Sequence, residues 1–133
     1  MRSYIPLIAR VLLGLIFVMS GFSKITGFES TQQHMASHGI PLTAVALVGA
    51  IVIEILGGLS VILGLWARAG AISLVLFLIP ATLIFHTDFG DQTQMIMFLK
   101  NLSIMGGLLL VTAYGSGEYS ICSLEKAEEM AHA

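Results

Sequence analysis

Four long apolar segments separated by short polar stretches make up most of this 133-residue chain. They cover about residues 4–23, 44–66, 69–86 and 95–114. Crossing about 30 Å of hydrocarbon takes roughly 20 residues of α-helix, and each segment comes close to that length. The pattern predicts an all-α integral membrane protein, a four-helix transmembrane bundle that forms a single domain over residues 1–133.

The segment between the first two spans, KITGFESTQQHMASHGIPLT, is too polar to cross a membrane. Ser30 is placed to cap a short helix from about Thr31 to His38, which Gly39 and Pro41 would end. The apolar side of this helix would dip into the membrane surface. We therefore expect a short interfacial helix after the first span.

The remaining connections are short. Ala67 and Arg68 would form a tight turn, which makes the second and third spans antiparallel neighbours. Pro80 lacks a backbone N–H and should bend the third span. Residues 117–133 are polar and charged, and we expect them to form a cytoplasmic tail.

Composition agrees with a membrane protein, because 56% of the residues are hydrophobic and 11% are charged, against about 45–50% and 25% in soluble domains. The net charge of −2 and the lack of a basic patch argue against a nucleic-acid partner. Cys122 is the single cysteine, so one chain can build neither a disulfide nor a thiolate metal cluster.

The distribution of cations predicts the orientation. Lys24 and Lys100 fall near the side opposite the termini. The cations on the side of the termini are Arg2, Arg10, Arg68 and Lys126. Because cytoplasmic loops carry the excess of Lys and Arg, we expect both termini in the cytoplasm.

Glu54 lies near the middle of the second span, where a charge costs about 2.5–3.5 kcal/mol and normally faces protein or water. Its side of the helix carries the small residues Ala50, Gly57 and Gly58. Small residues let helices approach closely in lipid. Glu54 should therefore point toward other helices and find a partner there.

One face of the first span carries Arg10, Gly14, Phe17, Gly21 and Lys24. We expect this face to meet Glu54, with Arg10 as its nearest counter-charge in an ion-pair network. The alternative is that Arg10 extends its charge to the membrane surface. The glycines expected at helix contacts are Gly14, Gly21, Gly57, Gly58 and, in the fourth span, Gly107.

A candidate ligand site is expected where Lys24, His86 and Lys100 converge from three helix ends, with Asn101 beside them. Ammonium donors and a histidine that exchanges protons near neutral pH suit an anion or a polarised carbonyl. A quinone head group or a small sulfur oxyanion would fit. His86 and Glu54 are the candidate catalytic groups, as proton carriers. A structural ion-pair network that clamps the helices is the alternative.

No motif for haem, a dinucleotide or a phosphate loop is present, so we expect no built-in cofactor, and a diffusible quinone or a partner's cofactor in any redox role. His34 and His38 have the spacing of two metal ligands on a helix, but no third ligand lies near them in sequence. Methionines of the fourth span are typical of lipid-facing or core positions. We expect no metal site.

Five stretches of this chain resemble the DoxX family of small bacterial and archaeal membrane proteins, from about Ala9 to Ser123. They are ARVLLGLIFVMSGFSKITGF, EILGGLSVILGLWAR, FHTDF, MFLKNLSIMGGLLL and YGSGEYS. The motif positions that carry over are Arg10, Gly21, Lys24, Glu54, Gly57, Gly58, Gly64, His86, Lys100 and Asn101. The chain departs from common family endings at Ser120 to Ser123, where Cys122 stands in place of an Asp.

The resemblance implies four transmembrane helices in the plasma membrane, and is closest to the small proteobacterial inner-membrane members. The family takes its name from a thiosulfate:quinone oxidoreductase subunit, and other members are linked to membrane redox complexes with superoxide dismutase and a sulfurtransferase. It therefore implies a redox-associated component, a subunit or accessory of a quinone-linked oxidoreductase, that binds a quinone or small sulfur compound near the outer face. The expected partners are the lipid bilayer, a redox protein and a second copy of the chain. A proton-coupled small-molecule transporter using Glu54 and a non-catalytic membrane scaffold are the alternatives.

Overall fold

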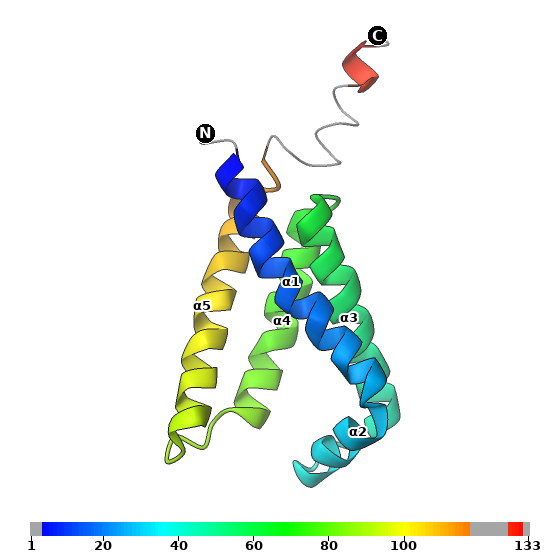
Figure 1. The fold of residues 1–133 in the computed structure, drawn as a ribbon, viewed down its shortest axis with the longest axis vertical. Helices are drawn as coiled ribbons and strands as arrows, with labels where there is room; N and C mark the ends of the chain where they lie inside the picture. Colours follow the sequence, from blue (N-terminus) through cyan, green and yellow to red (C-terminus); the bar gives the residue numbers. More distant parts are fainter. Residues whose placement is uncertain (1–3, 118–127, 132–133) are drawn as a thin grey trace.

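The computed structural model describes residues 4–117 and 128–131, and five helices account for most of this part of the chain (Figure 1). The helices are α1 (Tyr4–Thr26), α2 (Phe28–Ser37), α3 (Thr43–Leu63), α4 (Ala67–Phe85) and α5 (Gln92–Tyr114). Four of them, α1, α3, α4 and α5, are long and apolar enough to span a membrane. The predicted all-α fold with four spans and a short helix after the first is confirmed.

The connection between α3 and α4 lies earlier than predicted. Gly64 adopts a left-handed conformation (φ 74°) and ends α3 at Leu63, and Trp66 is also left-handed (φ 53°). The turn is therefore at residues 64–66, and α4 already begins at Ala67. Glycine reaches the left-handed region without steric cost, which makes it the natural stop for α3.

The short helix α2 begins at Phe28, three residues before the predicted start. Ser30 does not cap it, because the Ser30 hydroxyl donates to the carbonyl of Gly27 (3.1 Å) from inside the helix. Gly27 alone separates α1 from α2, so the two helices form nearly continuous helical structure with one bend. Met35 is the buried residue of α2.

Helix α5 starts at Gln92, three residues before the predicted boundary, because the Asp91 carboxylate accepts a hydrogen bond from the backbone N–H of Thr93 (3.0 Å). This is a side-chain cap of the helix N-terminus. The predictions for Arg2, Cys122, Lys126 and most of the tail concern residues outside those that the structure describes.

Glycines lie where the helices meet. A Cβ added at Gly14 of α1 would lie 2.6 Å from the carbonyl oxygen of Gly58, and one added at Gly58 would lie 2.9 Å from the carbonyl oxygen of Gly14. These two backbones are therefore in direct contact. At three other glycines the neighbour is a side chain: Ile55 at Gly21, Leu74 at Gly57 and Leu13 at Gly107. Gly70, which the sequence analysis did not select, packs its backbone near the Gly57 carbonyl.

The bundle is closed at one end and open at the other. The buried core is formed by α4, by the C-terminal halves of α3 and α5, and by Phe17 of α1. Its members Val61, Leu74 and Leu108 are fully buried. Helix α1 contacts α5 near this end, through Leu13 and Gly107. Toward the other end α1 follows α3 while α5 follows α4, so the two pairs diverge (Figure 1).

We expect Gly14→Ala to lower the free energy of unfolding by about 1–3 kcal/mol, because the new methyl group meets the backbone of α3 and must push the helices apart. Gly106→Ala on α5 is the matched control, since a Cβ there meets nothing within 4 Å. Alanine at an open helical site should be neutral or slightly stabilising. Thermal unfolding in mild detergent measures both, and equal midpoints for the two variants would contradict the contact.

Candidate functional site

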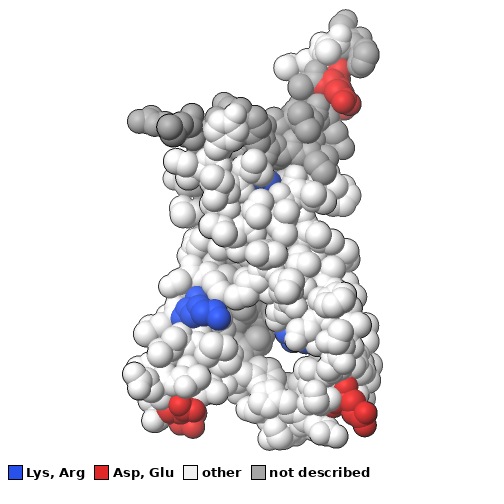
Figure 2. Space-filling model, in the orientation of Figure 1, with Lys and Arg blue, Asp and Glu red and all other residues white. Residues whose placement is uncertain are grey.

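The divergence of the two helix pairs leaves a cavity of about 600 Å³ in the open half of the bundle. All five helices contribute to its wall. Figure 2 shows the molecule hollowed in its lower half, with acidic side chains at the lower end on either side of the hollow. The wall is mostly apolar, with aromatic rings from Phe17, Phe77 and Phe85.

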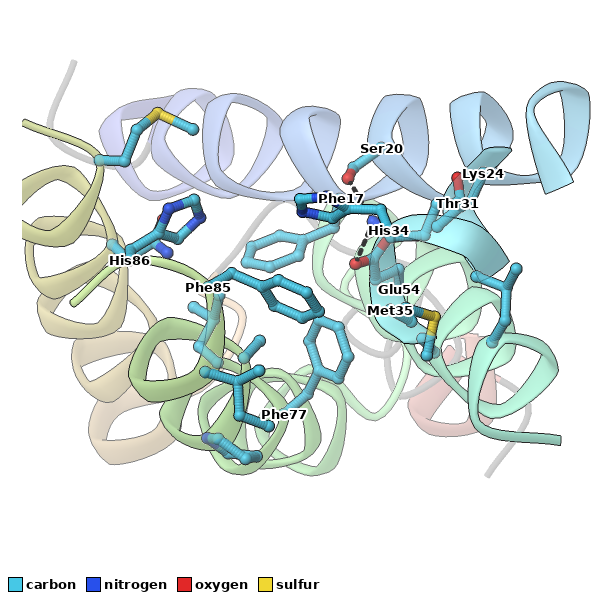
Figure 3. Close-up of a pocket in the computed structure, with 18 of the residues that line it drawn as sticks. Phe17, Ser20, Lys24, Thr31, His34, Met35, Glu54, Phe77, Phe85 and His86 are labelled. Carbon is cyan, nitrogen blue, oxygen red and sulfur yellow. Dashed lines mark hydrogen bonds and ion pairs between the residues drawn. The ribbon is translucent and has the colours of Figure 1, made fainter. Parts of the chain in front are cut away.

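An ion pair between Lys24 and Glu54 forms one side of the cavity (Figure 3). The Lys24 Nζ donates to both carboxylate oxygens of Glu54, at 2.8 and 3.0 Å, and to the Ser20 hydroxyl at 2.9 Å. The side chain of Glu54 is 4% exposed and that of Lys24 is 25% exposed. Because an ammonium group has three N–H donors, the hydrogen-bonding capacity of Lys24 is fully used within the protein.

The expected ion pair between Arg10 and Glu54 is a wrong prediction. The Arg10 Nη1 donates to the carbonyls of Val61 (3.2 Å) and Ile62 (3.1 Å), and the side chain is buried. These carbonyls belong to the last turn of α3, where they have no partner within the helix. Glu54 lies about two turns, or 10 Å, before Val61 on α3, toward the N-terminus of that helix. Arg10 thus stabilises the C-terminus of α3, where a cation is favourable.

The opposite side of the cavity is formed by polar groups of α4 and α5. His86 Nδ1 lies 3.0 Å from the Gln94 side-chain oxygen. An amide oxygen can only accept, so Nδ1 carries the proton in this arrangement and Nε2 is left for another partner. The Asn101 amide donates to the Thr82 hydroxyl at 3.0 Å, which leaves its oxygen and second N–H available.

Lys100 also lines the cavity, and it is exposed. Within residues 4–117 and 128–131, it makes no hydrogen bond or ion pair. It lies eight residues from the start of α5, about 12 Å along the helix. Lys100 is therefore the cation of the cavity with free donors.

Helix α2 covers the end of the cavity that faces the membrane surface. His34 stacks on Phe85 with ring centroids 5.2 Å apart, and His38 meets Phe85 edge to face at 4.7 Å. In Figure 3 the rings of His34, Phe85 and Phe17 lie between the Lys24–Glu54 pair and His86. These contacts connect α2 to the end of α4.

The residues that were predicted for the ligand site line this cavity, but the role of Lys24 differs from the prediction. Lys24, His86, Lys100, Asn101 and Glu54 all contribute to its wall. Lys24 is engaged by Glu54, so it is no longer a free ligand donor. Two kinds of cavity residue were not predicted for the site. They are the polar partners Ser20, Thr82 and Gln94 and the aromatic rings of Phe17, Phe77 and Phe85.

No group of three or more His, Cys, Asp or Glu side chains that could hold a metal ion is found in the described part of the chain. His34 and His38 lie with their rings 4.6 Å apart. His38 Nδ1 is near the carbonyl of His34 (2.9 Å), and both rings contact Phe85. Their observed role is ring packing.

Comparison with known proteins identifies relatives over most of the chain. A family model described as DoxX matches residues 5–87. "Inner membrane protein YqjF" of Escherichia coli (strain K12) is 39% identical over 115 residues, which are 86% of this chain and 87% of that protein. "Inner membrane protein YphA" of the same strain is 36% identical over 126 residues, 90% of this chain and 89% of that protein.

A more distant relative has a name that refers to chemistry. "Putative oxidoreductase CatD" of Bacillus subtilis (strain 168) is 39% identical over 75 residues, 56% of this chain and 54% of that protein. No solved structure matches the chain.

We expect Lys24 and Glu54 to be energetically coupled. In a double-mutant cycle with Lys24→Met and Glu54→Leu, the coupling energy should be about 0.5–3 kcal/mol, because each single change leaves its partner without a counter-charge. Arg10→Met with Glu54→Leu is the matched control, and these two changes should add within about 0.5 kcal/mol. The measurement is the free energy of unfolding in detergent. Coupling of Glu54 to Arg10 and not to Lys24 would contradict the structure.

Proposed function

This chain belongs to the DoxX family, and from that premise we propose that it is a redox-associated component of the bacterial inner membrane whose cavity binds the ring of a quinone. The observation that carries the proposal is the cavity itself. An apolar and aromatic wall with a few polar groups is the usual make-up of a site for a small organic ligand. Its volume of about 600 Å³ lies in the usual range for such sites.

The polar groups suit the two carbonyl oxygens of a quinone. Lys100 and Asn101 retain N–H donors that can reach into the cavity. Phe17 and Phe85 offer ring faces for stacking. A neutral ring with two acceptors matches this combination of flat apolar surface and separate donors.

A small sulfur oxyanion fits the cavity less well than a quinone. Such an ion needs several cationic donors close together, and Lys24 is already neutralised by Glu54. The cavity is also much larger than a small inorganic anion requires. Of the two ligands that the sequence suggested, the quinone is therefore the one we propose.

Reduction of a quinone to a quinol takes up two electrons and two protons. In the proposed role the electrons come from a partner redox protein, and His86 with its available Nε2 exchanges protons at the ring. The oxidoreductase in the name of the relative CatD supports such a role. The chain then acts as a membrane subunit or accessory of a quinone-linked oxidoreductase.

We expect purified protein to bind decylubiquinone, and Lys100→Met to weaken the affinity about tenfold, the effect of losing one charge-assisted hydrogen bond. Arg68→Met is the control, because Arg68 lies beside Gly115 at the other end of the bundle. Binding is measured by equilibrium dialysis in mild detergent, and solvent extraction of the purified protein tests for a co-purified quinone.

The proposal is wrong if neither a co-purified quinone nor binding of decylubiquinone is found. If the protein binds thiosulfate and no quinone, the ligand is a small sulfur compound. If no ligand binds, uptake driven by a pH gradient that is lost in Glu54→Gln would support the transporter alternative. A folded protein with none of these properties would support the scaffold.

We also propose that both termini face the cytoplasm, which places α2 and the cavity mouth at the outer face. Cys122, the only cysteine of the sequence, allows a direct measurement. A membrane-impermeant maleimide should label it in inverted inner-membrane vesicles and leave it unlabelled in spheroplasts. The Cys122→Ser variant is the control for background labelling, and the reverse pattern would invert the orientation.

A further inference from the structure

The cavity has two sides through which a ligand could pass. The first faces the membrane surface, and α2 covers it. Phe85 at the end of α4 contacts both His34 and His38 of α2, and Met35 of the same helix is buried. A water-soluble ligand arriving from the surface would have to displace this helix.

The second side faces the bilayer, between α1 and α5. Leu13 and Gly107 close the gap between these helices toward the core end. Beyond that contact α1 stays with α3 through Gly21 and the Lys24–Glu54 pair, and α5 diverges from it (Figure 1). The space-filling view shows a hollow in this half of the molecule (Figure 2). We call its side between α1 and α5 the lateral slot, and define it by Ile16 on α1 and by Met97 and Ile104 on α5, which all line the cavity.

The lateral slot opens toward lipid. Both α1 and α5 are long and apolar enough to span the membrane, so a gap between them lies at the depth of the acyl chains. Both helices carry exposed apolar side chains, among them Leu12 (66%) on α1 and Leu99 (55%) on α5. An opening with apolar walls at this depth fits a hydrocarbon chain and not an aqueous channel.

Lys100 marks the depth at which the slot meets the polar part of the cavity. It lies seven residues, or about 10 Å, from Gly107 along α5, and Ser20 lies seven residues from Leu13 along α1. The two helices are antiparallel, so these polar groups face the cavity at similar depths on opposite walls. A ligand whose ring lies between them has a direct path for a chain through the slot.

We propose that the lateral slot holds the isoprenoid chain of the ligand, so that this site takes quinones that reside in the membrane and enter sideways from the bilayer. The inference rests on the proposed function and names its substrate class, a long-chain membrane quinone. The chain gains little by moving from lipid into the slot, because both surroundings are apolar. The slot acts by giving the chain room while the ring is bound.

The test fills the slot and compares two ligands with the same ring. Ile16→Trp places a large side chain in the slot, and Met19→Trp, on the lipid-exposed surface of the same helix, is the matched control. The ligands are decylubiquinone and its tail-less parent ring, both measured by equilibrium dialysis in nanodiscs. Ile16→Trp should weaken decylubiquinone about tenfold and leave the tail-less ring within about twofold, while Met19→Trp should change neither.

Equal weakening of both ligands by Ile16→Trp would overturn the inference, because the tryptophan would then act on the ring site. Unchanged affinity for both ligands would overturn it as well. Met97→Trp, on the opposite wall, repeats the test should Ile16→Trp fold poorly. If the unmodified protein binds neither ligand, the proposed function itself fails, whereas binding of both without an effect of the slot variants removes only the lateral path.

Discussion

The ion pair between Lys24 and Glu54 is the constraint on which the open half of this bundle depends. A carboxylate in the middle of a transmembrane helix requires a partner, and Lys24 supplies one with bonds to both oxygens. The pair joins α1 to α3 at a level where α5 has already diverged. It therefore replaces the packing that side chains of α4 and α5 provide at the closed end. A cavity can exist beside α1 because α1 does not need those helices to stay in place.

Glycine contacts hold α1 against α3 at the closed end of the bundle, and the ion pair holds the two helices together at the open end. At the closed end the backbones of Gly14 and Gly58 touch, which fixes the distance and the axial register of α1 against α3. That register sets Gly21 level with Ile55 and brings Lys24 one turn beyond, where its side chain reaches back toward Ser20 and Glu54. Side chains on a helix lean toward its N-terminus, so a lysine near the C-terminal end of α1 is well placed to do this.

The sequence was sufficient for the spans and for the direction of Glu54, because both follow from apolar length and from helical periodicity. It was insufficient for the partner of Glu54. Arg10 and Lys24 lie on the same face of one helix, and periodicity gives the angle of a residue around the axis but not its level against a neighbouring helix. Packing of Gly14 against Gly58 sets that level, and it could not be known before the fold.

The residues of the cavity wall could likewise be predicted only in part from the sequence. His86, Lys100 and Asn101 were found because polar residues are conspicuous in an apolar helix. Phe17, Phe77 and Phe85 were not, since an aromatic residue in a membrane span is equally suited to lipid, core or ligand. The cover that α2 provides also depends on tertiary contacts, because His34 and His38 are spaced as metal ligands and in the structure pack on Phe85.

Four lysine and arginine residues lie in the spanning helices, and three of them, Arg10, Lys24 and Lys100, differ in their partners in a way that bears on function. Arg10 satisfies the carbonyls at the end of α3, and Lys24 neutralises Glu54, so both charges are compensated by the protein. Lys100 lies about 12 Å along α5 at the cavity, without a partner in the described residues. Lys100 is exposed and its N–H donors are free to turn toward a ligand. A ligand with an acceptor oxygen in the cavity would bind Lys100 without breaking an existing ion pair, and this makes Lys100, rather than Lys24, the cation best suited to bind it.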